Sequence, residues 1–138
     1  MSVAKHAVVV DIANVMGSVP DGWWRDRAGG AARILTQLSK LAEAGISGQL
    51  FGRPDDRLFP RWIAVIEGQA KAAKDVPGID VVRARGEGDD TIVDEAQRLV
   101  GEGFGVSVVT RDRGLIQRVE SVGADARPVR WLRDMFIS

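Results

Sequence analysis

Short apolar runs rich in β-branched residues recur along this chain, and each of them predicts a strand. A strand buried on both faces of a parallel sheet has such a continuous apolar pattern. Residues 124–129 (ADARPV) predict a further strand at the edge of a sheet, because Pro128 cannot donate a hydrogen bond to a neighbouring strand. The other runs are 7–12 (AVVVDI), 62–67 (WIAVIE), 79–84 (IDVVRA) and 105–110 (GVSVVT).

Helical periodicity separates these predicted strands. From about residue 24 to residue 44, Ala and Leu recur at three- and four-residue spacing, and Gly45 predicts the end of this helix. Residues 46–60 hold Gly, Pro and several charges, which predict a long loop. The alternation of strands and helices predicts an α/β fold with a doubly wound parallel sheet, formed by a single domain over residues 1–138. The remaining helices are expected at 69–75, 89–101 and 112–122, with a last helical turn at 131–136.

Acidic and amide side chains stand where several of these strands end. Asp11 ends the first strand, and Asn14 follows it closely. The loop after the third strand leads to Asp89 and Asp90, and Asp112 comes directly after the fourth strand. Ligands of open α/β sheets bind at the carboxyl ends of the strands. We therefore expect these side chains to lie along one edge of the sheet.

Helix capping is the simpler explanation for each of these acids taken alone. Asp89, Asp90 and Asp112 stand at predicted helix starts, where a carboxylate accepts hydrogen bonds from free backbone N–H groups and complements the helix dipole. Asp11 fits this explanation less well, because the next predicted helix begins about ten residues later. Capping also does not explain why the acids share one edge of the sheet.

Carboxylates close together repel one another, so some must become protonated or a cation must join them. Oxygen ligands suit Mg²⁺ or Mn²⁺, and such an ion can activate a bound water and stabilise charge on a phosphoryl oxygen. The chain has no Cys and no Tyr, and His6 is its one His, which excludes thiolate chemistry and His-rich metal sites. Glu67 and Asp94 are weaker candidates for the same acidic site.

Three segments carry these residues in order along the chain: VVVDIANVMGS, GEGDDTIVDEA and VSVVTRDRGL. They contain Asp-x-x-Asn after a hydrophobic strand, an acidic pair that opens a helix, and Thr-x-Asp after a hydrophobic strand. With these motifs the chain resembles the PIN-like ribonuclease domains, and among them the NYN branch, over about residues 7–116. Residues 17–27 (GSVPDGWWRDR) also resemble a pattern of small actinobacterial proteins that are labelled nucleotide pyrophosphohydrolases.

The resemblance implies a PIN-like three-layer α/β/α sandwich with a mostly parallel central sheet, in which the strand order is 3-2-1-4-5. It also implies hydrolysis of RNA phosphodiester bonds with Mg²⁺ or Mn²⁺, and we expect single-stranded or loop RNA as the substrate. The roles that it implies are metal binding by Asp11, Asp90 and Asp112, support of these ligands by Asp89, and orientation of the site by Asn14.

Arginine side chains near the same edge are candidates for phosphate contacts. Arg85, Arg111 and Arg113 could bind the substrate around the acidic centre. The formal net charge is zero, with 19 basic and 19 acidic residues, so a basic rim would be local. Trp23 and Trp24 lie beside arginines and could stack a base, although packing at the start of a helix or a dimer contact is the simpler interpretation.

Alternative functions stay open at this point. The same chemistry could hydrolyse free nucleotides or another phosphoester. A catalytically degenerate RNA-binding module is another alternative, because Ile116 stands where some relatives carry a further acid. A homodimer and an antitoxin-like partner also stay open, although the sequence shows no segment for binding such a partner. No apolar run reaches the ~18 residues of a membrane helix and no secretory signal is evident, so we expect a cytoplasmic protein without a membrane partner.

Overall fold

Five parallel strands form the central sheet of the computed structural model, which describes residues 5–136. The strands are β1 (Lys5–Asp11), β4 (Arg61–Ile66), β5 (Ile79–Arg83), β6 (Phe104–Val109) and β7 (Asp125–Arg127). Their order in the sheet is β5-β4-β1-β6-β7, which confirms the expected order 3-2-1-4-5 of the five predicted strands. The first strand is therefore central, and its carboxyl end lies between those of β4 and β6.

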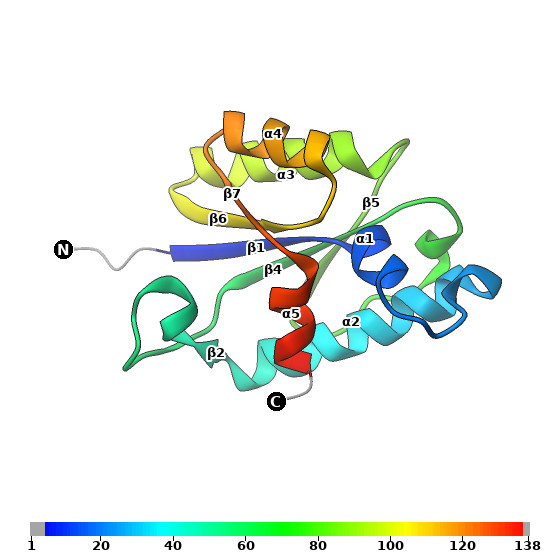
Figure 1. Ribbon diagram of the computed structural model, residues 1–138, viewed down its shortest axis with the longest axis horizontal. Helices are drawn as coiled ribbons and strands as arrows, with labels where there is room; N and C mark the ends of the chain where they lie inside the picture. Colours follow the sequence, from blue (N-terminus) through cyan, green and yellow to red (C-terminus); the bar gives the residue numbers. More distant parts are fainter. Residues whose placement is uncertain (1–4, 137–138) are drawn as a thin grey trace.

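Helices cover both faces of this sheet and produce three layers (Figure 1). One face packs against α1 (Ile12–Gly17), α2 (Arg27–Ala44) and α5 (Val129–Phe136), and the other against α3 (Gly88–Gly101) and α4 (Arg113–Ser121). Three short 3₁₀ turns complete the helical segments: η1 (Trp23–Arg25), η2 (Gly48–Phe51) and η3 (Gly68–Ala72). The α/β fold predicted from the sequence is confirmed.

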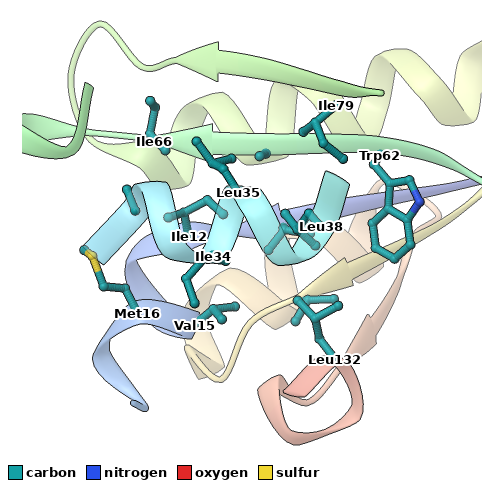
Figure 2. Packing of buried hydrophobic residues seen from close by; sticks show 14 of the residues in the cluster. Ile12, Val15, Met16, Ile34, Leu35, Leu38, Trp62, Ile66, Ile79 and Leu132 are labelled. Carbon is teal, nitrogen blue, oxygen red and sulfur yellow. The ribbon is translucent and has the colours of Figure 1, made fainter. Parts of the chain in front are cut away.

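The alternation of side chains along β1 divides the core into two clusters. Val8 and Val10 belong to the cluster under α2, whereas Ala7 and Val9 belong to the cluster under α3 and α4. Figure 2 shows Leu35 and Leu38 of α2 packed in the first cluster. All of these residues are essentially inaccessible to solvent. Burial on both faces explains why the strand reads as a continuous apolar run.

Several segments differ from the sequence-based expectations. The expected loop at 46–60 contains η2 and a short antiparallel pair, β2 (Ile46–Ser47) with β3 (Arg57–Leu58). The expected helix at 69–75 is the 3₁₀ turn η3. The long helix begins at Arg27 rather than near residue 24, because Asp26 caps it by accepting a hydrogen bond from the Gly29 N–H at 2.9 Å.

The largest difference concerns the chain after β1. Helix α1 begins at Ile12, directly after the strand, and Asp11 is its N-cap residue. The expectation that the next helix begins about ten residues later was therefore wrong, and capping is part of the role of Asp11. Among residues 5–136, no helix combines the length and the apolar character that crossing a bilayer needs.

Candidate active site

Asp11 occupies the centre of the acidic edge. Its side chain stands at the end of the central strand, and the residue is only 5% exposed. Its Oδ2 atom accepts hydrogen bonds from Asn14 Nδ2 at 2.8 Å and from Thr110 Oγ1 at 2.9 Å. A buried hydroxyl and a half-buried amide therefore fix the orientation of this carboxylate.

The pKa of Asp11 is raised to about 6, and burial is the main cause. Repulsion from the carboxylates of Asp89 and Glu67 contributes to the rise, whereas the hydrogen bonds from Thr110 and Asn14 oppose it. The charged form of Asp11 thus lacks sufficient compensation from the described residues. A nearby cation would favour that charged form.

Asp112 belongs to the same hydrogen-bonded network. Its backbone N–H donates to Thr110 Oγ1 at 3.2 Å, and the N–H of the preceding residue, Arg111, donates to Asn14 Oδ1 at 3.2 Å. The Oδ1 atom of Asp112 caps α4 by accepting a hydrogen bond from the Leu115 N–H at 2.9 Å. The network joins the ends of β1 and β6. These two strands are neighbours in the sheet, so Asp11 and Asp112 stand at neighbouring strand ends.

Asp89 and Glu67 complete the cluster of acids, which we call the acidic site (Asp11, Glu67, Asp89 and Asp112). Burial raises the pKa of Asp89, and the carboxylates of Asp112 and Glu67 raise it further. Glu67 follows β4, and its Oε2 atom accepts a short hydrogen bond from the N–H of Gly88 at the start of α3. Glu67 thus contacts the start of the helix that carries Asp89.

Asp90 lies apart from this cluster. Its side chain is 75% exposed and forms an ion pair with Arg118 of α4 at 2.8 Å. Successive residues of a helix point about 100° apart, so the side chains of the acidic pair point in different directions. Asp89 is thus the member of the pair that is coupled to the other acids, whereas Asp90 contacts Arg118 at the surface. Asp94, on the same helix, is exposed.

The acids do not form a cage of direct metal ligands. Within residues 5–136, no three His, Asp or Glu side chains are arranged to hold a metal ion together. Mg²⁺ is often bound through one or two carboxylates while it keeps several waters, and the oxygen-only acidic site fits that kind of binding. Burial, together with repulsion from neighbouring carboxylates, raises the pKa values of Asp11 and Asp89, and a divalent cation would favour their charged forms.

The arginines that were predicted to contact the substrate are exposed and have no partner among the described residues. Within the described part of the chain, the side chains of Arg85, Arg111 and Arg113 have no hydrogen bond or ion pair with another residue, and all three residues are exposed. Arg111 and Arg113 flank Asp112, and Arg85 lies in the loop before α3. These cations are free to contact an anionic ligand near the acidic site.

A pocket of about 360 Å³ adjoins the acidic site, and the sequence analysis did not predict it. Residues from four separate segments line it, so no local pattern could predict it. Trp23 is half-buried and packs against the core under α2, in agreement with the packing interpretation, and its ring also lines the pocket. Trp24 is 55% exposed and does not line the pocket.

Comparison with known proteins supports the architecture. No protein-family model matches the chain, and no curated protein matches it. The chain is similar to the crystal structure of Rae1 (YacP) from Bacillus subtilis, with a TM-score of 0.70 and 16% identity over 95% of this chain and 74% of that one. A mutant of the same protein gives a TM-score of 0.69 and 18% identity over 95% and 75% of the two chains. The protein therefore has the α/β fold of Rae1.

Proposed function

We propose that this protein is a metal-dependent ribonuclease that hydrolyses phosphodiester bonds in RNA. The observation that carries the proposal is the surroundings of Asp11, whose pKa burial raises to about 6 with contributions from the carboxylates of Asp89 and Glu67. Asp112 joins the same network, because Thr110 bonds both to the Asp11 carboxylate and to the Asp112 N–H. Such a site is electrostatically incomplete without a cation. The order of the three sequence motifs and their resemblance to PIN-like ribonucleases support the choice of reaction.

The residues that would hold Mg²⁺ or Mn²⁺, in part through the waters that the ion keeps, are Asp11, Asp89 and Asp112. Asp89 takes the role that the motif comparison gave to Asp90, because Asp90 is paired with Arg118 on the outer side of α3. When bound, the ion would lower the pKa of a water molecule and stabilise charge on the phosphoryl group. Thr110 and Asn14 position Asp11 through their hydrogen bonds to its Oδ2 atom.

The proposed substrate is single-stranded or loop RNA. Arg111 and Arg113 lie on either side of Asp112, and Arg85 lies just before α3, so their free guanidinium groups can contact phosphates that flank the reacting one. The formal net charge of the chain is zero. An acidic centre with arginines around it can still bind a polyanion, because the positive charge is local. This arrangement favours the phosphodiester backbone as the ligand.

Hydrolysis of free nucleotides is the second candidate function. The specific observation that favours it is the pocket of about 360 Å³ beside the acidic site, since that volume lies within the range of small-molecule pockets. A free nucleotide could place its base there and its phosphates at the acids. The two candidates use the same residues and differ in substrate length.

A panel of substrates tests both functions. We expect labelled RNA to be cleaved in Mg²⁺ or Mn²⁺ and not in EDTA, with single-stranded DNA and nucleoside triphosphates as comparison substrates. Asp112→Asn should lower the rate at least about 100-fold, in line with the loss of a group that holds a catalytic metal. The matched control is Asp55→Asn, which removes an exposed carboxylate in the loop between β2 and β3.

Binding measurements keep the test independent of the substrate chosen. Calorimetric titration with Mn²⁺ should show binding to the wild-type chain and to Asp55→Asn, and weaker binding to Asp112→Asn. Hydrolysis of nucleoside triphosphates without RNA cleavage would favour the second candidate. If the protein shows no cleavage and does not bind Mn²⁺ at millimolar concentration, both candidate functions are rejected. That result would favour a non-catalytic RNA-binding module.

A further inference from the structure

The pocket beside the acidic site has an apolar floor and a polar rim. The buried side chains of Ile12, Met16 and Ile66 form part of its lining. Figure 2 shows these three residues at one end of the core cluster under α2, where α1 approaches β4. The floor therefore belongs to the rigid core, and an occupant would meet a preformed apolar surface.

The rim combines an aromatic ring, a guanidinium group and two carboxylates. Trp23 and Arg27 line the pocket, with the guanidinium carbon 5.4 Å from the ring centroid. Glu67 and Glu87 also line it. Carboxylates repel a phosphate, so the pocket suits a neutral, flat group that can stack on Trp23 or Arg27. Nucleobases stack on aromatic rings and on arginine planes in this way.

The pocket and the acidic site are continuous. Glu67 lines the pocket, and its carboxylate also raises the pKa values of Asp11 and Asp89. Gly17 is close both to Trp23, which lines the pocket, and to Arg111. A Cβ atom at Gly17 would be 3.9 Å from Trp23 Cζ2 and 3.6 Å from Arg111 Nη2. A nucleotide with its base in the pocket would thus have an arginine beside it and the acids next to it.

Glu87 supplies a criterion for the choice of base. Among the described residues its carboxylate has no hydrogen-bond or ion-pair partner, so both oxygens can accept. Guanine presents two adjacent donors, N1–H and the N2 amino group, and a carboxylate can accept two parallel N–H bonds at once. Adenine, cytosine and uracil do not present two such donors side by side.

We propose that this pocket binds a guanine base of the RNA substrate, with the ring against Trp23 and Arg27 and with N1–H and N2–H donating to Glu87. This proposal rests on the proposed ribonuclease function and adds a sequence preference to it. It predicts that cleavage occurs next to guanosine.

Nucleotide binding in EDTA tests the pocket without catalysis. We would titrate the full chain with 5′-GMP and 5′-IMP and follow backbone amide signals by NMR. Inosine lacks only the N2 amino group, so it is the matched ligand control. We expect GMP to bind about tenfold more tightly than IMP, as the loss of a hydrogen bond to a charged group implies. The shifted amides should include those of residues 86–88.

Two pairs of variants separate the pocket from a general effect on the chain. Glu87→Gln should remove the preference for GMP over IMP, whereas Glu43→Gln, at an exposed glutamate near the end of α2, should keep it. Trp23→Phe should weaken GMP binding severalfold. Trp24→Phe should not, because Trp24 is exposed and lies outside the pocket. Thermal denaturation shows whether each variant is folded.

Equal binding of GMP and IMP, or amide shifts located elsewhere, would overturn the guanine pocket. RNA cleavage without this preference would leave the proposed ribonuclease function intact and reject only the pocket assignment. GMP binding without any cleavage would support the pocket and reject the ribonuclease. The two proposals can thus fail separately.

Discussion

The hydroxyl of Thr110 donates a hydrogen bond of 2.9 Å to Oδ2 of Asp11, although 99 positions separate the two residues in the sequence. Both residues are buried, Thr110 at 1% and Asp11 at 5% exposure. The same hydroxyl oxygen accepts the N–H of Asp112 at 3.2 Å. One side chain therefore connects the two strand ends that carry the acids, and its donated bond lowers the pKa of Asp11 against the larger effect of burial.

Replacement of Thr110 by Val should destabilise the protein. The substitution keeps the shape of the side chain and removes a donor to a buried carboxylate and an acceptor for the Asp112 N–H, so we expect a loss of about 1–3 kcal/mol in the free energy of unfolding at pH 7. Chemical denaturation measures this loss. Thr110→Ser is the matched control, because it retains the hydroxyl, and it should retain the greater part of the stability. Equal losses in both variants would show that the hydroxyl bond is unimportant.

Asp89→Asn and Asp90→Asn should have very different effects on RNA cleavage. Asp89 is electrostatically coupled to Asp112 and Glu67, whereas Asp90 is paired with Arg118 in solvent. We expect the first substitution to lower the cleavage rate about 100-fold or more, as removal of a metal-binding group does, and the second to change it less than about threefold. The two substitutions make the same chemical change at adjacent positions, so each serves as the control for the other. A greater loss in Asp90→Asn would restore the role that the motif comparison implied.

The stability of the metal-free protein should fall as the pH rises from about 4 to about 7. The folded protein holds a proton on Asp11 with a pKa of about 6, against 3.8 for the ordinary group, so between these values the folded state binds more protons than the unfolded state. The contribution of Asp11 to stability is then greatest below pH 3.8, and it is lost as the pH rises through about 6. The raised pKa of Asp89 acts in the same direction.

This pH effect should amount to roughly 3 kcal/mol at most for Asp11, from a shift of about two pKa units. Denaturation of the wild type and of Asp11→Asn in EDTA at several pH values measures it, and the variant should show a flatter profile. Asp55→Asn, with an exposed carboxylate, should follow the wild type. Added Mg²⁺ should stabilise the wild type above pH 6, since an ion that binds only the folded state shifts the equilibrium. Identical profiles in EDTA for wild type and Asp11→Asn would contradict the raised pKa.

The strands were predictable because burial leaves a strong local signal, whereas their order was expected only from the resemblance to PIN-like domains. Val8, Val9 and Val10 lie in a strand covered on both faces, and such a strand needs apolar residues at every position. The short helix α1 was not predicted, because its six residues contain too few turns to show a period. Its presence changes the role of Asp11, which both caps α1 and stands at the centre of the acidic site.

The edge at which the acids gather was also predictable, since it follows from the parallel strand order. The choice between Asp89 and Asp90 was not, because it depends on how α3 is rotated about its axis. That rotation is set by buried residues such as Ile92 and Ala96 and by the Gly88 N–H bond to Glu67. The contribution of Glu87 to a pocket could not be predicted either, because the residues that share the pocket with it, apart from Gly86, are distant in sequence.

Gly88 provides a way to move Glu67 without changing its chemistry. A Cβ atom at Gly88 would lie 2.9 Å from Glu67 Oε2 and 3.2 Å from its Cδ, closer than ordinary contact allows. The atoms that it meets are the far end of a flexible side chain, so Gly88→Ala should push the carboxylate away and break its bond to the Gly88 N–H. We expect a loss of about 1–2 kcal/mol in stability, as small overpacking changes cause.

Gly86→Ala is the matched control, because nothing lies within 4 Å of a Cβ atom at that position. Displacement of Glu67 removes a carboxylate that raises the pKa of Asp11, so the pKa of Asp11 should fall in Gly88→Ala and stay unchanged in Gly86→Ala. NMR titration of the Asp11 carboxyl carbon in EDTA measures both values. An unchanged pKa in Gly88→Ala, together with unchanged stability, would show that Glu67 does not depend on Gly88 for its position and that the acidic site tolerates a side chain there.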